Sequence, residues 1–484
     1  MDNFTVKLIN FGSVDGKKES QNEQFESLFY PKDSYYNKLL EKNKFLIIGR
    51  KGTGKTILAE YYKKQCNKNE DTYCKILDIS NFIEKKLQSF DHIQIEKEEM
   101  EVFWRYVLLT ELGTMIIENT NYFKKKTSPK FRKLNKVLKN RNMILNGATI
   151  KNGFAFSYKK NANFNKETEK NYKPASYFHN MESISSIIMK CLGDSKSYSI
   201  IYDDVDELED KVENRQYFYD MMKSLIKATE KLNNEIYLKN SKVILTFRND
   251  IINQLHGGAS NLNKVVTECG IKISWYHNYN DSPVKHPIMK MLLHKIRASV
   301  PEFKFVENDV IFNELFPTEK KAGDKNLLKF LIDNSFGRPR DVISFLQIYC
   351  NKYPEENKFS YRELVNCLSD YSEWFYHELY NEINIHEKKD DIVSALNLIK
   401  KYGEATFLFR DLNEYYQMDS SNFKITNLEQ TIEELFKLGI LGNSRRKSKG
   451  KTIIEFAYRD NVSTNANFDL RFTVHYGLRN YLAI

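Results

Sequence analysis

The sequence predicts an α/β protein in which a parallel sheet is followed by a helical domain and a C-terminal winged-helix domain. Up to about residue 283, apolar strand-like runs alternate with helical patterns, and such alternation is typical of an α/β core. The pattern is then helical without strands to about residue 382, and it ends in helices followed by β-like runs. A chain of 484 residues has room for about three domains of roughly 150 residues each.

The first region, residues 1–283, contains short, mostly apolar runs that are bounded by polar segments. Runs of this kind suit strands covered on both faces, as in a parallel sheet. Helical patterns separate them, so we expect helices packed against one sheet. The strands are expected at 44–48, 73–77, 198–202 and 242–246, and the helices at 57–64, 98–119, 181–192 and 217–232.

The rest of the chain divides into a helical part and a mixed part. After residue 382, helices at 391–402, 408–416 and 428–438 precede two β-like runs that flank a basic turn. Helix, helix, helix and hairpin is the order of a winged helix, whose third helix can enter a nucleic-acid groove. We therefore expect a core at 1–283 with a basic insertion at 121–178, a helical lid at 284–382 and a winged helix at 383–484.

A phosphate-binding motif lies between the first predicted strand and the helix after it. Residues 49–56 read GRKGTGKT and fit GxxxxGK[ST] in the strand–loop–helix context that this motif requires. The glycines let backbone N–H groups turn toward a phosphate, and the helix start adds its positive end. The expected nucleotide ligands are Gly49, Gly52, Thr53, Gly54, Lys55 on the β- and γ-phosphates, and Thr56 on Mg²⁺. The sequence therefore predicts a P-loop NTPase core that binds a nucleoside triphosphate with Mg²⁺.

An acidic motif follows the third predicted strand, in the segment SIIYDDVDEL at 199–208. A buried strand that ends in an acid places a carboxylate beside the P-loop, where it can hold the magnesium shell. Asp203 has this position and, together with Thr56, forms the expected metal site. Asp206 is the first candidate for the base that orients the attacking water, Asp204 is its main rival, and Glu207 follows closely.

Arginines at two later places could complete the site. Thr246 and Arg248 lie at the carboxyl end of the fourth strand, where ligands gather in open α/β sheets. Either residue could sense the γ-phosphate; the alternative for Arg248 is an ordinary surface arginine. Further on, Arg338, Pro339 and Arg340 begin a helix of the lid. A proline near a helix start is structurally ordinary, whereas the two arginines beside it could close over the bound nucleotide.

Taken together, these motifs resemble those of the AAA+/STAND branch of P-loop ATPases. The acidic motif has the form hhhhDxhDE seen in STAND and NACHT-type ATPases. Arg248 matches the arginine of their sensor 1 strand, and Gly337 with Pro339 matches the GxP element of their helical lid. The segments FGSVDGKKES at 11–20 and FTVHYGLRNYL at 472–482 resemble, more narrowly, a family of poorly characterised bacterial P-loop ATPases.

The resemblance implies an ATP-controlled switch or ATPase that forms oligomers and works with an effector protein, frequently in bacterial defence against phage. Many STAND members have a small residue where this chain has Asp204, so the identity of the base stays open. Two rival functions remain. One is an ATP-regulated DNA-binding regulator similar to replication initiators, and the other is an ATPase scaffold subunit that holds a toxin or nuclease effector.

The net charge of +10 is concentrated in one segment. Residues 121–175 hold fifteen Lys and Arg against two acids, a balance of +13, so the rest of the chain sums to −3. Lysines alternate there with aromatics, which suits a nucleic-acid backbone with stacked bases, and 142–158 has a hairpin-like rhythm. An acidic protein partner, self-assembly or a neutral solvated insertion would also fit. A second basic stretch, the wing turn at 443–451, could contact DNA or pack within the chain.

Other features narrow the class of protein. The longest apolar stretch, 103–117, is interrupted by Arg105 and Glu111 and is shorter than the ~18 residues of a membrane span. The start of the chain lacks the pattern of a signal peptide. The cysteines are scattered without metal-binding spacing, as expected for reduced thiols of a cytoplasmic protein. We expect no membrane contact, and we expect Trp104, Trp275 and Trp374 to lie in the core.

Overall fold

The computed structural model shows a chain that divides into two compact units. One unit comprises Met1–Lys32, Gly52–Gly54 and Ser274–Ile484, and the other comprises Asp33–Lys51 and Lys55–Ile273. The three-domain division of the sequence stays a prediction. The structure describes residues 4–78, 97–145, 175–193, 196–205, 215–256, 260–275, 282–316, 326–384, 386–446, 452–459 and 465–484.

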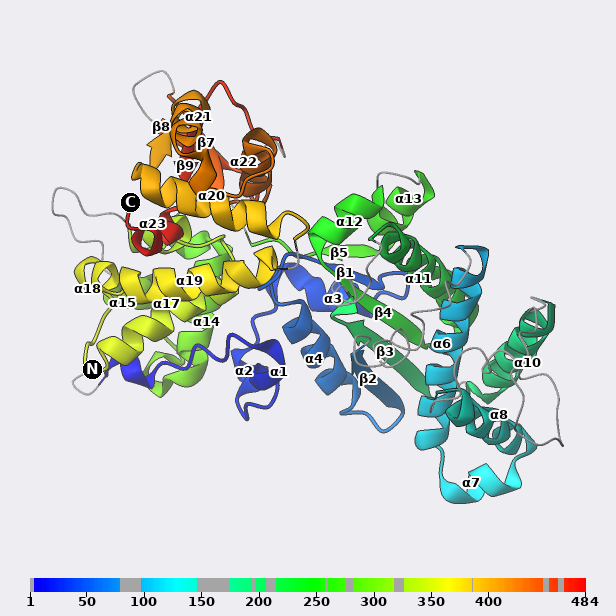
Figure 1. The fold of residues 1–484 in the computed structure, drawn as a ribbon. Coiled ribbons are helices and arrows are strands. Elements are labelled where there is room, and N and C mark those ends of the chain that lie inside the picture. The colour runs from blue at the N-terminus through cyan, green and yellow to red at the C-terminus, as the bar shows by residue number, and fades with distance from the viewer. Residues whose placement is uncertain are drawn as a thin grey trace. The chain divides into compact units, whose positions relative to one another are not determined.

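The second unit is built on a parallel sheet of the predicted kind (Figure 1). Its strands have the order β2-β3-β4-β1-β5, with every neighbouring pair parallel. The four predicted strands are confirmed, and β5 was not predicted. The strands are β1 (Leu46–Ile48), β2 (Thr72–Asp78), β3 (Ser197–Asp203), β4 (Lys242–Phe247) and β5 (Gly270–Lys272). The strand that leads into the P-loop, β1, therefore lies between β4 and β5.

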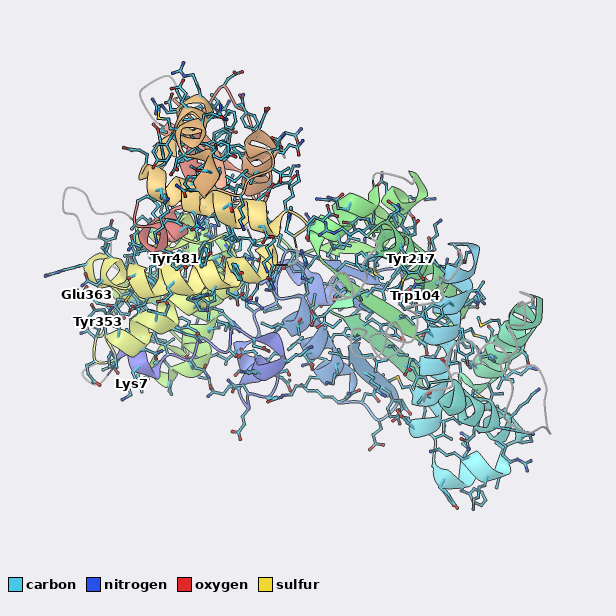
Figure 2. All side chains as sticks on the ribbon, in the orientation of Figure 1. Lys7, Trp104, Tyr217, Tyr353, Glu363 and Tyr481 are labelled. Atoms are coloured by element: carbon cyan, nitrogen blue, oxygen red, sulfur yellow. The ribbon has the colours of Figure 1, made fainter. Side chains whose placement is uncertain are left out.

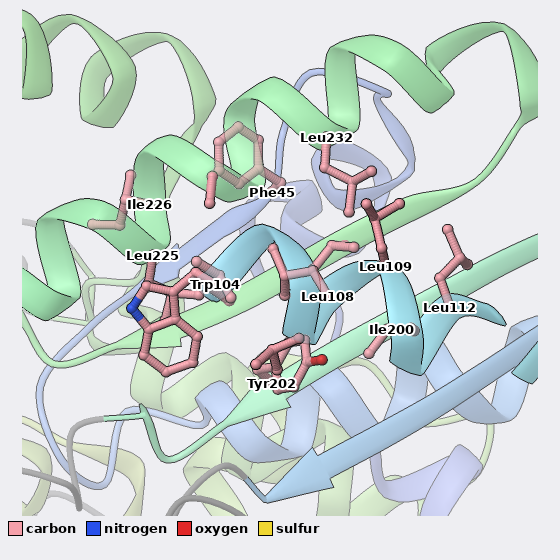
Figure 3. Packing of buried hydrophobic residues seen from close by; sticks show 14 of the residues in the cluster. Phe45, Trp104, Leu108, Leu109, Leu112, Ile200, Tyr202, Leu225, Ile226 and Leu232 are labelled. Carbon is pink, nitrogen blue, oxygen red and sulfur yellow. The ribbon is translucent and has the colours of Figure 1, made fainter. Parts of the chain in front are cut away.

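Helices cover both faces of this sheet. Alternate strand residues such as Ile200 and Tyr202 belong to a core cluster with α6 (Lys97–Glu118) and α11 (Arg215–Ile236). Figure 3 shows Trp104 and Leu108 of α6 lying between α11 and the strand that carries Tyr202. On the other face, the Tyr62 hydroxyl of α4 (Lys55–Cys66) lies 3.1 Å from the Ser199 hydroxyl. Since strand side chains alternate between faces, residues 199, 201 and 203 share the face covered by α4.

Trp104 confirms the prediction that it lies in the core, because it is fully buried and its Nε1 donates to the Met221 carbonyl at 3.0 Å. Three further described helices of this unit pack around the sheet. They are α3 (Tyr35–Leu40), α12 (Asn249–His256) and α13 (Ser260–Cys269).

The described part of the basic insertion is helical, with α7 (Tyr122–Thr127), α8 (Pro129–Leu145) and α10 (Ala175–Cys191). On α8, the buried Phe131, Leu134 and Leu138 follow the spacing of one helix face. These residues join the core cluster that contains α6 and α10. The hairpin-like expectation is wrong for residues 142–145, which complete α8 with no Gly or Pro to end it. The rest of that stretch, 146–158, lies outside the described residues.

In the first unit, the described part of 284–382 is helical without strands, as predicted. Shorter helices α1 (Gly16–Glu19) and α2 (Phe25–Leu28) precede it in the chain. Trp374 is half-buried and not a core residue. The helices are α14 (Pro287–Ser299), α15 (Asn308–Leu315), α16 (Leu327–Asp333), α17 (Pro339–Lys352), α18 (Tyr361–Asn366) and α19 (Leu368–Ile383).

The C-terminal part of the same unit has the predicted order of three helices and a hairpin. These elements are α20 (Lys389–Tyr402), α21 (Phe409–Met418), α22 (Leu428–Lys437), β7 (Leu441–Arg446) and β8 (Thr452–Phe456). Two further strands, β6 (Thr406–Phe407) and β9 (Arg471–Val474), complete an antiparallel sheet of order β6-β9-β7-β8. Its assignment to the winged-helix class stays a prediction. In the wing, Arg445 pairs with Glu455 at 2.5 Å, and residues 447–451 lie outside the described residues.

The last helix, α23 (Tyr476–Leu482), packs against α19. The Tyr481 ring, labelled in Figure 2, stacks on Tyr376 with centroids 3.9 Å apart. His475 caps the start of α23 and is fully buried, with its Nδ1 accepting from the Gly477 N–H at 3.1 Å. Its Nε2 therefore carries the proton and donates to the Ser335 carbonyl at 3.2 Å. Burial lowers the pKa of His475 well below its ordinary value.

We expect this histidine to make the protein sensitive to mild acid. The folded-state pKa of His475 is depressed, so below about pH 6.5 only the unfolded chain binds the proton. This one group should therefore remove up to about 2 kcal/mol of unfolding free energy between pH 7 and pH 5. The variant His475→Asn should show a shallower fall of the thermal midpoint over this range than the parent, measured by scanning fluorimetry. The matched variant His377→Gln, at an exposed position, should follow the parent profile. Equal slopes for the parent and His475→Asn would contradict the assignment.

Candidate nucleotide-binding site

The phosphate-binding loop has the backbone that its glycines permit. It begins after β1 ends at Ile48, and it closes where α4 begins at Lys55. Gly52 and Gly54 have φ values of +78° and +94°, a region that residues with a Cβ rarely adopt. A Cβ built on Gly54 would meet no atom within 4 Å. The requirement for glycine at position 54 is therefore conformational, and the space beside it is open to a ligand.

Lys55 is held inside this loop. Its side chain is buried, and its Nζ donates to the carbonyl oxygens of Gly49 at 3.1 Å and of Arg50 at 3.4 Å. These acceptors are neutral, and a phosphate oxygen would be a stronger, charge-assisted partner for a buried ammonium. Thr56 follows in the first turn of α4 and is half-buried. The loop thus presents a cation and a hydroxyl from neighbouring positions of one helix start.

Asp203 ends β3 and is almost fully buried, with 1% of its surface exposed. Its Oδ1 accepts a hydrogen bond of 2.6 Å from the Thr246 hydroxyl of β4. Its Oδ2 is buried and has no hydrogen-bond partner among the described residues. Buried carboxylate oxygens are normally satisfied, so this atom fits a role that a cation or its water shell completes. Because Asp203 shares the sheet face covered by α4, its placement matches that of the expected ligand Thr56.

Thr246 acts as the support of this acid. It is fully buried on β4, and its hydroxyl oxygen also accepts from the backbone N–H of Asp204 at 3.2 Å. Asp204 adopts a left-handed backbone with φ of +52°, which costs a non-glycine residue energy. One hydroxyl therefore holds both residues at the end of the acidic strand. Because the Thr246 hydroxyl already donates its proton to Asp203, it has no proton left to donate to a phosphate. The other two candidate bases, Asp206 and Glu207, lie outside the described residues.

Arg248 follows β4 directly. Its guanidinium pairs with Asp250, with Nε to Oδ1 at 3.2 Å and a second contact through Nη2. The arginine side chain is 17% exposed, whereas its partner is 58% exposed. Arg248 is therefore anchored on one side at the carboxyl edge of the sheet. Its role as a phosphate sensor stays a prediction.

The tip of the loop, Gly52–Gly54, makes its contacts within the first unit. Trp275 donates from Nε1 to the Thr53 carbonyl at 2.9 Å, and it is buried as predicted for a core residue. The backbone N–H of Arg340 lies 3.5 Å from the Gly52 carbonyl. A Cβ on Gly52 would come within 3.1 Å of the Arg340 Cβ. The contact between Trp275 and Thr53 was not predicted from the sequence. A buried indole N–H needs an acceptor, but the sequence does not indicate which one.

Arg338 and Arg340 are already engaged by acids. The Nε of the buried Arg338 donates to both oxygens of Asp341, at 3.1 and 2.9 Å, and its Nη1 donates to Glu382 at 2.8 Å. Burial opposes the charge of Arg338, but these two carboxylates outweigh burial and raise its pKa. The half-exposed Arg340 pairs with Glu378 at 3.0 Å. Pro339 opens α17. Nucleotide contact by Arg338, Pro339 and Arg340 therefore stays a prediction.

Comparison with known proteins gives a family match over part of the chain. Residues 286–380 match the family described as FunZ-associated C-terminal helical domain. That stretch is about a fifth of the 484 residues and lies within the helical region of the first unit. No curated protein matches the chain. The crystal structure of Cdc6p from Pyrobaculum aerophilum is similar at 12% sequence identity and a TM-score of 0.33, over 89% of this chain and 91% of that one.

No helix in the part of the chain that the structure describes combines the length and apolarity needed to cross a membrane.

Proposed function

We propose that this protein is a Mg²⁺-dependent ATPase of the P-loop class. The observation that carries the proposal is the buried Oδ2 of Asp203, which lacks a hydrogen-bond partner among the described residues. It lies on the sheet face covered by the helix that begins with Lys55 and Thr56. A P-loop next to a strand-end carboxylate of this kind is the arrangement that holds a nucleotide with its metal ion.

Each residue of the proposed site has its own role. Backbone N–H groups of residues 52–56 and the Lys55 ammonium would bind the β- and γ-phosphates, while Thr56 and Asp203 would hold Mg²⁺ with phosphate and water as further ligands. The ion supplies charge neutralisation on the phosphate oxygens. Thr246 fixes the Asp203 carboxylate by its hydrogen bond of 2.6 Å. Asp206, Asp204 and Glu207 remain the candidates for orienting the water, and Arg248 the candidate sensor.

The finer part of the proposal is that ATP state controls assembly or an effector partner, as the resemblance to STAND-type ATPases implies. Its support is the pair of contacts that join the loop tip to Trp275 and Arg340 within one compact unit. If nucleotide binding moved Gly52, the contact between the Gly52 carbonyl and the Arg340 N–H at the start of α17 would have to change. Oligomer formation, an effector partner and a role in defence against phage belong to this finer proposal.

Asp203→Asn tests the metal role, because it keeps the shape of the side chain and removes its charge. We expect binding of a fluorescent ATP analogue in EDTA to change little and the Mg²⁺-dependent gain in affinity to disappear. Turnover, measured by phosphate release, should fall by at least about 10- to 100-fold, the cost already seen when groups behind a metal ligand are removed. Asp71→Asn serves as the control, because Asp71 is an exposed acid directly before the neighbouring strand β2. Unchanged Mg²⁺-stimulated turnover in Asp203→Asn would refute the assignment.

A further inference from the structure

The outer face of α7 and α8 is a cationic surface, in which one lysine, Lys130, also donates to the Lys190 carbonyl of α10 at 2.8 Å. Helix α8 turns Phe131, Leu134 and Leu138 into the core, which leaves Arg132, Lys133 and Lys136 exposed on its other side. Helix α7 has no buried residue at all, and it lies beyond the ends of α6 and α8, away from the sheet (Figure 1). We define the cationic surface by its side chains, Lys124, Lys125, Lys126, Lys130, Arg132, Lys133 and Lys136.

The charge of this surface is not balanced by its surroundings. None of its seven cations forms an ion pair with a carboxylate among the described residues. The neighbouring sequence cannot supply one either, because no Asp or Glu occurs from Asn119 to Lys166. A cationic surface without neighbouring acids in the sequence attracts an anionic partner at distances set by the salt concentration.

Two aromatic rings stand among these cations. Tyr122 and Phe123 of α7 are 70% and 74% exposed, although large apolar side chains at a surface gain nothing for folding. The Lys126 ammonium lies 4.4 Å from the centre of the Tyr122 ring. Exposed rings next to unpaired cations can take a stacked base and its phosphate together, which is how single strands are bound without sequence preference.

We propose that the cationic surface of α7 and α8 binds single-stranded nucleic acid. Duplexes offer the same phosphates, but their base faces are covered by neighbouring pairs, so the exposed rings would have no partner. An acidic protein would pair with the charges, but pairing with carboxylates does not explain why Tyr122 and Phe123 are exposed beside them. The proposal goes beyond ATP hydrolysis and does not rest on it, since binding can be measured without nucleotide.

The test uses the full chain and fluorescein-labelled oligonucleotides of twenty thymidines or twenty uridines, followed by anisotropy at several salt concentrations. The variant Lys124→Gln/Lys125→Gln/Lys126→Gln removes three cations. If each contacts one phosphate, the log–log salt slope should become shallower by about 2, and affinity near 0.1 M salt should fall about 100-fold. Equal effects on the two oligonucleotides indicate recognition through phosphate and base faces, and a stronger effect on one identifies DNA or RNA as the preferred strand.

Two matched variants separate this proposal from its rivals. Tyr122→Ser/Phe123→Ser should weaken single-strand binding by at least about 30-fold if each ring stacks on one base, and it should leave any weak duplex binding unchanged. Lys285→Gln/Lys290→Gln/Lys304→Gln removes the same charge from exposed positions of the helical region and should bind like the parent. Circular dichroism confirms that each variant is folded. Duplex binding that is as tight as single-strand binding and insensitive to the rings would overturn the proposal. So would binding to vesicles of anionic lipid with none to oligonucleotides.

Discussion

We expect Lys55→Ala to weaken ATP binding strongly and to abolish hydrolysis. The substitution removes the buried ammonium, which donates to the carbonyls of Gly49 and Arg50 and would donate to phosphate in the complex. A hydrogen bond to a charged group contributes about 1.5–3 kcal/mol, so affinity for ATP should fall about 10- to 150-fold, and turnover should fall to background. Titration with a fluorescent ATP analogue and phosphate release measure the two effects.

The same variant tests whether nucleotide controls assembly. If ATP changes the mass of the parent protein, measured by light scattering after size exclusion, Lys55→Ala should show one mass with or without ATP. Lys63→Ala, which removes a partly exposed lysine from the same helix, should behave like the parent in every assay. ATP turnover that survives Lys55→Ala in full would refute the proposed function, and an ATP-dependent mass change that survives it would refute control through this site.

The second large effect is expected from Arg338→Met, as a loss of stability in the first unit. This change leaves the buried Asp341 and the nearby Glu382 without their shared cation, and breaking a buried ion pair in this way costs about 3–5 kcal/mol. Asp341 also accepts from the Phe336 N–H at 2.9 Å, so the turn before α17 should loosen as well. Urea denaturation followed by tryptophan fluorescence measures the loss.

Arg340→Met is the matched control, because it has the same chemistry at a more exposed place. Its ion pair with Glu378 has both side chains 23% exposed, and pairs of that kind contribute about 0–1 kcal/mol. Arg338→Met/Asp341→Asn/Glu382→Met removes the three charges together, keeps an acceptor for the Phe336 N–H, and should recover much of the stability. If Arg338→Met and Arg340→Met lost equal stability, the buried pairs would not be what holds this turn.

The fold was predictable where the sequence is locally consistent. Strands β1, β3 and β4 appear as mostly apolar runs, because both of their faces are covered. Strand β2 lies at the edge of the sheet and is mostly half-buried, yet its run at 73–77 is apolar enough to be found as well. Strand β5 could not be found in this way. It has three residues, Gly270–Lys272, with only the middle one buried, and it is defined by pairing with β1 and not by its own composition. Residues 142–145 were expected to begin a hairpin, but they form the last turn of α8. This helix is stabilised by its apolar face, which packs against neighbouring helices.

The candidate site divides in the same manner. The P-loop and Asp203 are visible in the sequence because the motif itself contains the geometry, namely a strand, glycines and a helix start. Thr246 was placed at the right edge of the sheet, but its hydrogen bond to Asp203 depends on β3 and β4 being neighbours. The link from Arg338 to Glu382 spans 44 residues, and that from Trp275 to Thr53 spans 222. No local pattern records contacts over such separations.

The position of β1 in its sheet has a consequence for how the protein is made. Both of its hydrogen-bonding partners come late, β4 at Lys242–Phe247 and β5 at Gly270–Lys272. The phosphate loop is therefore translated roughly 220 residues before the last strand that completes its support, an interval of about 11–45 s at ordinary synthesis rates. During that time the nascent chain carries an unpaired apolar strand, which is a site for chaperone capture or aggregation. Under the proposed function, ATP binds the folded loop, so it should add stability to the sheet once β4 and β5 have paired with β1.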